Sequence, residues 1–415
     1  MAQLRDANVQ VWRDAATGWS NFANDAQWAA EDIRTQGAGK LTDAWKDQVG
    51  QAAYDVLSKI ADKYECAADS MKGAQMALDG LAEAVEVAQR ELTSALTLVQ
   101  WPILLNDDGT VHIDANDQGC ESDWDRIQRV ATTVQNLVHD AVEAANQADA
   151  EAARIFKEIT DGVNITNKGD ANNDPETALG LQQDASTAQV DMIHLSLPAG
   201  QSPAVVAAWW NGLSDKEKKQ LELAVPTELM DLQGIPDDVK TGLRGEDDGY
   251  DRMVLVKFAL DHANDTSIDK YGEDCTQFVS TALKNAGVNE SWSDIFSSSP
   301  EWHSGDTGFV AWLSGAEASR SWINAQDSHD FFLTHGGTEV QRVDAEPGDI
   351  VYFRDDAGNI YHSAIITSVT PDGDVKYTQH SPGRADYSLD ARAETIQDQQ
   401  GSNKVSIVRF RPDWH

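Results

Sequence analysis

The sequence predicts an α+β protein with several domains, in which a bundle of long helices precedes a region of helices and antiparallel strands. Two observations lead to this prediction. Apolar residues recur every three or four positions through most of residues 1–165, as they do in amphipathic helices. After residue 250, helical stretches are followed by short apolar runs that turn sequences separate. The chain has 415 residues, which is long enough for two or three domains.

Long apolar stripes predict the first two helices. One stripe runs from Leu4 to Ile33, and the next runs from about Leu41 to Val99. A continuous helix over the second range would be roughly 85 Å long. We therefore expect a break near Gly73 or Gly80, because glycine is a poor helix former.

A short hairpin and a third helix complete the predicted bundle. Asp108-Gly109 lies between the apolar runs Ile103–Leu105 and Val111–Ile113, and this arrangement is a strong hairpin signal. The third helix begins near Ser122 and reaches Ile155, with alanines along its apolar stripe that permit close packing. Three such helices bury their stripes most simply against one another in a bundle.

The rest of the chain divides into a linker and a second domain. Residues 166–245 are predicted to be a linker with short helices, because a run rich in Asn, Asp and Gly opens the segment. Its best helical stretch contains Trp209 and Trp210. Residues 246–415 are predicted to form a domain in which helices precede an antiparallel sheet, with the turns DDAGN and TPDGD between its strands.

The acidic composition limits the kinds of partner. Asp and Glu outnumber Lys and Arg by 69 to 32, which gives a formal net charge of −37. Nucleic acid and anionic membranes repel such a surface, so neither is an expected partner. No segment is apolar enough for a membrane helix, and the N-terminus lacks the apolar core of a signal peptide. We expect either a cytoplasmic protein or one exported without such a signal.

The three cysteines fall into two groups. Cys66 and Cys120 lie in the helical region, where a disulfide and two separate buried thiols both agree with the sequence. Cys275 follows Asp274, a favoured N-cap residue, and precedes an apolar pattern of helical spacing. The positive end of a helix favours a thiolate, and N–H groups of the first turn can stabilise an oxyanion. Cys275 is therefore the candidate nucleophile.

Two histidines on consecutive predicted strands are candidates for the base and its orienting group. His362 begins the strand HSAIITSV, and His380 lies on the next strand, so the turn between them makes the two strands antiparallel neighbours. His380 can then orient the ring of His362. Gln379 points to the opposite face, so only one of these two residues can take that role. A zinc site of Cys275 with the two histidines is a rival, but no HExxH or paired-cysteine motif supports it. No metal or cofactor is expected.

Several motifs in this region resemble one family. YGEDCTQFVSTAL is similar to the "DCTNFVSQAL" signature of the amidase domain in the NlpC-like, papain-fold superfamily. EPGDIVYF, HSAIIT and YTQHS resemble its later landmarks in the same order, and the segment around Trp322 is similar to its central helix. The resemblance covers about residues 248–412. It implies a papain-like fold, amide-bond hydrolysis, and a catalytic triad of Cys275, His362 and His380.

The resemblance also bears on residues beside the triad. Tyr271 and Asp274 match family positions, and with Gln379 they are candidates to line the oxyanion or substrate site, although Asp274 can instead serve only as the helix cap. Thr276 and Gln277 stand where the best-known NlpC peptidases have Ser and Gly. These two departures leave the substrate open.

The N-terminal part resembles the WXG-type helical regions that lead many actinobacterial type VII secretion substrates. The similarity rests on the hairpin-like DDGTVHID, the Ala-rich helix after it, and the stretch from VVAAWWNGL to GIPDDVK. Trp19-Ser20-Asn21 lacks the glycine of the motif. The resemblance implies secretion without a signal peptide, and a small helical secretion partner or an immunity protein as binding partner.

The combined expectation is an exported cysteine amidase that acts on a peptide, with peptidoglycan stem peptides as the first substrate class. One alternative is a helical interaction protein whose amidase domain is inactive or auxiliary. Another is acyl or amide transfer, which shares its first half-reaction with hydrolysis and cannot be separated from it by sequence.

Overall fold

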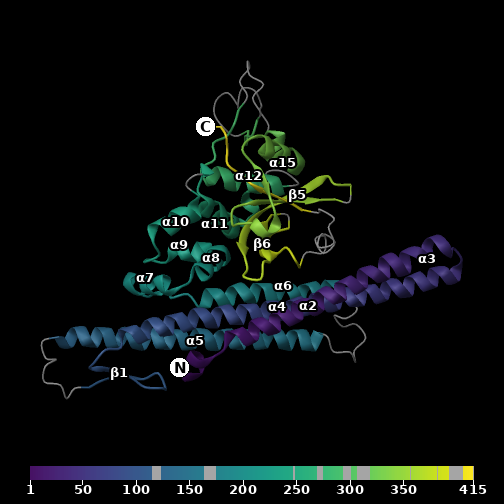
Figure 1. Cartoon of the computed structure of the whole chain (residues 1–415). Helices are drawn as coiled ribbons and strands as arrows, with labels where there is room; N and C mark the ends of the chain where they lie inside the picture. Colours follow the sequence, from purple (N-terminus) through teal and green to yellow (C-terminus); the bar gives the residue numbers. More distant parts are fainter. Residues whose placement is uncertain are drawn as a thin grey trace. The chain divides into compact units, whose positions relative to one another are not determined.

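The chain forms two compact units, Met1–Ser214 and Asp215–His415. A computed structural model describes the chain in ten stretches. Long helices dominate the first unit, and the second combines shorter helices with an antiparallel sheet (Figure 1). The predicted α+β class is confirmed. The described stretches are residues 1–114, 123–162, 174–245, 248–268, 274–292, 301–305, 318–355, 357–380, 382–391 and 405–414.

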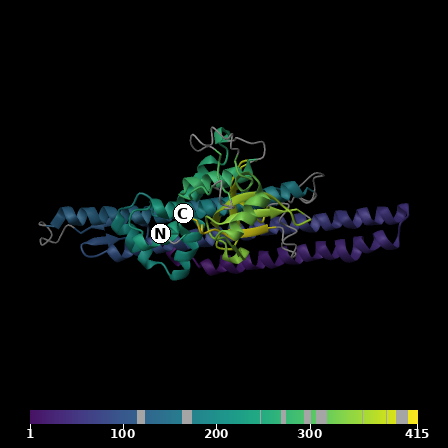
Figure 2. The ribbon, with the colours of Figure 1, turned by 90° about the horizontal axis from the view of Figure 1, so that it is seen from above.

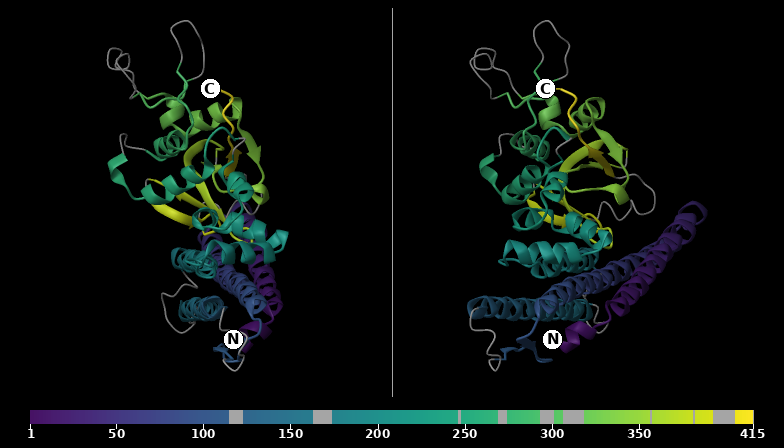
Figure 3. Two further views of the ribbon diagram at one scale, coloured as in Figure 1. Left: turned by 90° about the vertical axis from the view of Figure 1, so that its left-hand side faces the viewer. Right: turned by 60° about the vertical axis from the view of Figure 1, so that its left-hand side comes forward.

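Helix α4, Gln48–Leu98, is the central element of the first unit. Helices α2, α5 and α6 pack along it, and the two views of Figure 3 show α2 lying beside α4. A π-helical turn over Ile33–Ala38 links α2 to α3. The other helices are α1 (Ala2–Asp6), α2 (Val9–Asp32), α3 (Gly39–Ala44), α5 (Trp124–Gly162), α6 (Pro175–Leu195) and α7 (Pro203–Gly212).

The predicted break in the second helix is wrong, because α4 continues through both glycines. These glycines lie where other helices approach closely. A Cβ atom added at Gly80 would lie 2.6 Å from Met192 Cε of α6, and one at Gly73 would lie 3.3 Å from Ile159 Cδ1 of α5. The two glycines therefore allow neighbouring helices to approach α4 closely, and they do not end the helix. The predicted hairpin is confirmed as β1, Ile103–Leu105, paired antiparallel with β2, Val111–Ile113.

Helix α6 lies within residues 166–245, the segment that the sequence predicts to be a linker with short helices. The side chain of Asp174 accepts a hydrogen bond from the N–H of Glu176, and Pro175 occupies the first turn. Small residues such as Ala178 and Ala185 are buried against α4 and α5. Most of the buried residues of α6 are alanine or polar, with Leu179, Met192 and Ile193 as the larger apolar ones, so the periodic apolar signal in the sequence is weak. The predicted 166–245 segment is divided between the two units after Ser214.

The α2–α4 pair carries exposed apolar side chains. Figures 1 and 2 show that this pair extends beyond α5 and α6. On α2, Phe22 is 61% exposed and Trp28 is 75% exposed. On α4, Val49 and Val56 are exposed as well. The fold of this chain leaves these side chains largely uncovered by its described residues.

The described part of the second unit contains a six-stranded antiparallel sheet in the order β3-β8-β4-β5-β6-β7. Its strands are β3 (Thr338–Val340), β4 (Ile350–Arg354), β5 (Ile360–Val369), β6 (Val375–Gln379), β7 (Arg384–Ser388) and β8 (Val405–Arg409). Its helices are α8 (Asp215–Ala224), α9 (Pro226–Asp231), α10 (Asp237–Arg244), α11 (Arg252–His262), α12 (Cys275–Asn285), α14 (Arg320–Ile323) and α15 (Ala325–Thr334).

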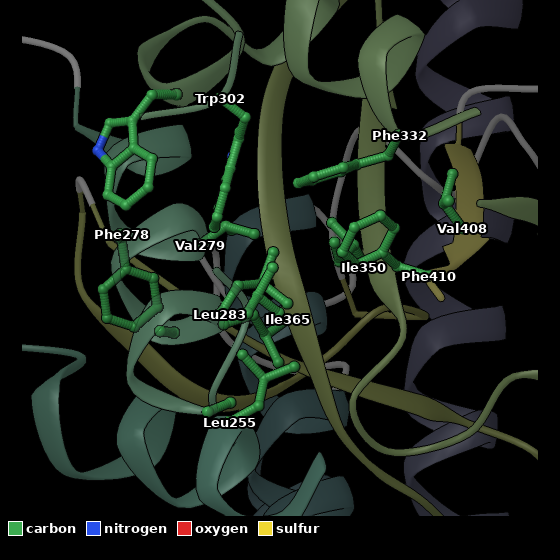
Figure 4. Close-up of a cluster of buried hydrophobic side chains, with 14 of the residues drawn as sticks. Leu255, Phe278, Val279, Leu283, Trp302, Phe332, Ile350, Ile365, Val408 and Phe410 are labelled. Atoms are coloured by element: carbon green, nitrogen blue, oxygen red, sulfur yellow. The ribbon is translucent and has the colours of Figure 1, made fainter. Parts of the chain in front are cut away.

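Helices α11, α12 and α15 contact the sheet at β5. Figure 4 shows the core that results, in which Phe278 and Leu283 of α12 lie with Leu255 of α11 and Ile365 of β5. A second apolar cluster, which includes Phe353, covers the other face of the sheet. This two-sided burial fixes the register of β5, and therefore which of its side chains face α12. No helix in the described ranges is both long enough and apolar enough to span a membrane.

Candidate active site

Cys275 is the first residue of α12, and Asp274 is its N-cap, as the sequence predicts. The thiol is 9% exposed and lies 3.7 Å from the hydroxyl of Thr276. Tyr352 of β4 is fully buried beside this region. Burial raises the pKa of Tyr352, and charge at Asp330 and at Cys275 acts in the same direction. The cysteine therefore sits at the positive end of a helix, close to the sheet.

A hydrogen bond between two buried hydroxyls ties the start of α12 to β5. The side chains of Thr276 and Ser363 lie 3.1 Å apart, and both are fully buried. Each of these residues directly follows a predicted catalytic residue in the chain. The bond brings the start of α12 close to the start of β5, but side chains alternate along a strand, so the ring of His362 points to the face of the sheet away from α12 and Cys275. Sequence reasoning missed this pair, because a Thr or Ser after a candidate residue carries no signal by itself.

The ring of His362 is hydrogen-bonded to Gln379 of β6. His362 Nε2 lies 2.8 Å from Gln379 Oε1, while Gln379 Nε2 donates to the carbonyl of Pro382 at 3.0 Å. The amide nitrogen of Gln379 is thus used as a donor, so its oxygen must accept from His362. A proton on Nε2 makes Nδ1 the basic nitrogen of the neutral ring. Both side chains are buried.

Side chains on β5 and β6 divide between the two faces of the sheet. His362 is the direct cross-strand partner of Phe353, so these two rings share a face, with centroids 5.6 Å apart. Ser363 follows His362 and points to the opposite face, toward α12. On β6, Gln379 bonds His362, whereas His380, which follows it, contacts α12. Gln379 and His380 therefore point to opposite faces of the sheet, as the sequence predicts.

His380 is bonded to the residue before Cys275. Its Nδ1 lies 3.1 Å from a carboxylate oxygen of Asp274, and each side chain is 5% exposed. The imidazole stacks on Phe278 of α12, with ring centroids 5.4 Å apart. The sequence offered His380 and Gln379 as alternative orienting groups for His362. The hydrogen bond to the His362 ring described above comes from Gln379, while His380 pairs with the helix cap.

The other predicted residues can be placed only in part. Cys66 is a buried free thiol in α4. Burial, followed by the nearby charges of Asp69 and Asp62, raises the pKa of Cys66 to about 11, so this cysteine is protonated at neutral pH. Cys120 and Tyr271 lie outside the described residues. Within the described ranges, no group of three or more His, Cys, Asp or Glu side chains is arranged to hold a metal ion.

The second unit is an α+β domain in which a helix that begins with cysteine packs on an antiparallel sheet that carries histidines, an arrangement consistent with a papain-like fold. Residues 249–405 match the family described as "Putative amidase domain". This match indicates an amidase-like function, at the level of a hydrolase that acts on amide bonds. No curated protein and no solved structure matches the chain.

Proposed function

We propose that the chain is a cysteine amidase with Cys275 as nucleophile and one of the two sheet histidines, His362 or His380, as general base. The observation that carries the proposal is the position of Cys275 as the first residue of α12. His380 contacts the N-cap of this helix, whereas the ring of His362 lies on the face of the sheet away from α12. The start of α12 supplies the electrostatic environment that favours a thiolate. The match to the amidase family supplies the reaction class.

In the proposed mechanism, the sulfur of Cys275 attacks the carbonyl carbon of the amide. The base, one of the two sheet histidines, accepts the thiol proton. Backbone N–H groups in the first turn of α12 stabilise the oxyanion of the tetrahedral intermediate. The same histidine then donates the proton to the leaving amine, and water hydrolyses the thioester to free the thiol. If His362 is the base, Gln379 is its orienting group.

The proposed substrate is an amide bond in a peptide, with peptidoglycan stem peptides first. This choice comes from the resemblance to NlpC-like enzymes, and it does not separate hydrolysis from transfer to another amine. Incubation with an added amine, followed by mass analysis, distinguishes the two outcomes. A product that is heavier by the amine indicates transfer, whereas a free carboxylate indicates hydrolysis.

The helical unit is proposed to serve in export and to bind a small helical secretion partner or an immunity protein. Its exposed side chains, such as Phe22 and Trp28, give a specific reason to expect a protein partner. Recovery of the protein from the culture medium of intact producing cells would support export. Strict retention inside the cells would count against it and favour the cytoplasmic alternative.

The same exposed surface supports the second candidate, an interaction protein with an inactive amidase domain. The Cys275→Ala variant separates the two candidates. For an amidase, this variant should lower turnover of peptidoglycan fragments by about 10⁴-fold or more, because the nucleophile is lost. Cys66→Ala is the matched control, since Cys66 is buried and protonated, and it should retain turnover. Equal product formation by wild type and Cys275→Ala would remove the case for a cysteine amidase.

Chemical labelling tests the base without a known substrate. Iodoacetamide should alkylate Cys275 at neutral pH much faster than Cys66, because only a thiolate reacts quickly. Loss of the base, in His362→Ala or in His380→Ala, should slow alkylation of Cys275 and lower turnover by about 10²- to 10⁴-fold. If His362 is the base, Gln379→Ala should lower turnover by a smaller factor, because the ring of His362 remains but is less well oriented. Alkylation of Cys275 that is equally fast in the wild type and in both histidine variants would contradict a Cys–His pair.

A further inference from the structure

Two buried hydroxyl groups form a chain of contacts that ends at the sulfur of Cys275. The Thr276 hydroxyl lies 3.7 Å from this sulfur and 3.1 Å from the hydroxyl of Ser363 on β5. Thr276 and Ser363 are both fully buried, so water does not compete for these contacts. Thr276 is therefore the middle member of a chain that runs from the sheet to the sulfur.

The protons of this chain can be ordered in two ways. In the first order, the Cys275 thiol donates to Thr276, and Thr276 donates to Ser363. The Ser363 proton then lacks an acceptor, because this side chain bonds no other residue in the described part of the chain. In the second order, Ser363 donates to Thr276 and Thr276 donates to the sulfur, so both hydroxyl protons are used. A buried donor without an acceptor is costly, and this cost favours the second order.

The second order suits a thiolate better than a thiol. A thiolate has no proton and can only accept, so it takes the hydrogen bond that Thr276 donates. A hydrogen bond to a charged acceptor is also stronger than one between neutral groups. The two hydroxyl groups keep their own protons, while the thiol proton goes to the histidine that serves as base.

We infer that the hydroxyl chain stabilises the thiolate of Cys275. Thr276 donates to the sulfur directly, and Ser363 acts through Thr276 as a positioning residue that fixes the direction of the bond. This inference rests on the proposed cysteine amidase and adds two residues that support its nucleophile. It holds whichever of the two sheet histidines is the base.

The first test measures the rate of Cys275 alkylation by iodoacetamide against pH, on the peptide that contains this cysteine. Thr276→Val removes the hydroxyl and keeps the shape, so the midpoint of the pH profile should rise by about 0.5–1 pH unit. Below the midpoint, the rate should fall about three- to tenfold, because less thiolate is present. Thr276→Ser keeps the hydroxyl and should retain the wild-type midpoint. An unchanged midpoint in Thr276→Val would overturn the inference.

The second test asks whether Ser363 acts through Thr276. Ser363→Ala should raise the midpoint by a smaller amount than Thr276→Val, because it leaves the bond from Thr276 to the sulfur possible but no longer fixes its direction. In the Thr276→Val background, Ser363→Ala should add nothing, because the path to the sulfur is already broken. Shifts that add in the double variant would show that Ser363 affects Cys275 by another route, and the chain would be rejected.

A neighbouring pair of hydroxyls provides the matched control. Ser328 of α15 and Tyr352 of β4 lie 2.9 Å apart, and both are fully buried. Among the described residues, neither hydroxyl is hydrogen-bonded to Thr276 or to the sulfur of Cys275. Ser328→Ala should therefore leave the alkylation midpoint unchanged, although it also removes a buried hydroxyl bond. A shift in Ser328→Ala as large as that in Thr276→Val would mean that any such loss disturbs the site, against the inference.

The hydroxyl chain and the proposed amidase can fail separately, because alkylation needs no substrate. Loss of turnover of soluble peptidoglycan stem peptides in Cys275→Ala, together with an unchanged alkylation midpoint in Thr276→Val, rejects only the hydroxyl chain. Full turnover in Cys275→Ala rejects the amidase itself, while the alkylation midpoints still test the chain. Loss of turnover in Cys275→Ala with a raised midpoint in Thr276→Val, and with the wild-type midpoint in Thr276→Ser, supports both.

Discussion

One buried carboxylate in each compact unit illustrates a different way of accommodating such a group. In the helical unit, Glu91 of α4 is 2% exposed, and its Oε1 has no hydrogen-bond partner among the described residues. Burial, with a smaller contribution from Asp140, raises the pKa of Glu91 to about 8. In the sheet unit, Asp349 is fully buried but accepts hydrogen bonds from Arg252 and Arg409. One carboxyl group stays neutral, and the other is compensated by guanidinium groups.

The difference lies in the side chains around each carboxylate. In the helical unit, Glu83 of α4 pairs with Arg13 of α2, but the Oε1 atom of Glu91, two turns further along α4, has no partner among the described residues. In the sheet unit, the start of α11 and the end of β8 place two arginines around Asp349. Protonation of Glu91 should therefore affect the stability of the helical unit, and the ion pairs of Asp349 that of the sheet unit.

The largest expected effect is the loss of Arg252. Arg252→Leu should destabilise the sheet unit by on the order of 3 kcal/mol, because a buried charge loses a partner. Arg411→Ala is the matched control, since this 60% exposed arginine pairs with Asp248 and should cost less than about 1 kcal/mol. Hydrogen exchange of peptides from residues 215–415 measures the loss of stability in each of the two variants. Equal protection in the two variants would show that the Asp349 cluster does not stabilise this unit.

The next effect concerns pH. Glu91 binds its proton up to about pH 8 when folded, but only to about 4.5 when unfolded, so the folded state holds more protons between these values. Its contribution is fully present below pH 4.5 and is lost as pH rises through 8, with a slope of at most about 1.4 kcal/mol per pH unit. Glu91→Gln should flatten this dependence and stabilise the helical unit at pH 8. An unchanged pH profile of helical hydrogen exchange in Glu91→Gln would contradict the assignment.

The smallest effect compares two glycines in the helical unit. A Cβ at Gly80 would lie 2.9 Å from the Gln189 backbone, so Gly80→Ala should cost about 1–2 kcal/mol despite its better helix propensity. Gly180 in α6 has nothing within 4 Å of such a Cβ, so Gly180→Ala should stabilise by up to about 1 kcal/mol. Thermal unfolding, monitored by circular dichroism, measures the loss of stability expected for Gly80→Ala and the gain expected for Gly180→Ala. A stabilising Gly80→Ala would mean that the helices are less closely packed than the contact distances indicate.

Local signals in the sequence predicted much of the fold. Helical spacing predicted α2, α4 and α5, and Asp108-Gly109 predicted the β1–β2 hairpin. The pattern around Asp274 and Cys275 predicted where α12 begins. Each of these features depends on residues that are close together in the chain, so it can be predicted from the sequence alone. Resemblance to a family added the amidase class, which a family match to residues 249–405 also indicates.

Contacts between distant segments decided the rest. Sequence could not show that α4 runs through Gly80, because the reason is the approach of α6 more than a hundred residues away. It left Gln379 and His380 as alternatives, and the pairing across the sheet gave the first to His362 and the second to Asp274. Periodicity and turn chemistry are properties of neighbouring residues, so the sequence by itself determined where elements begin and which residues they carry. The partner of each polar side chain depends on faces and registers that exist only once the elements have packed.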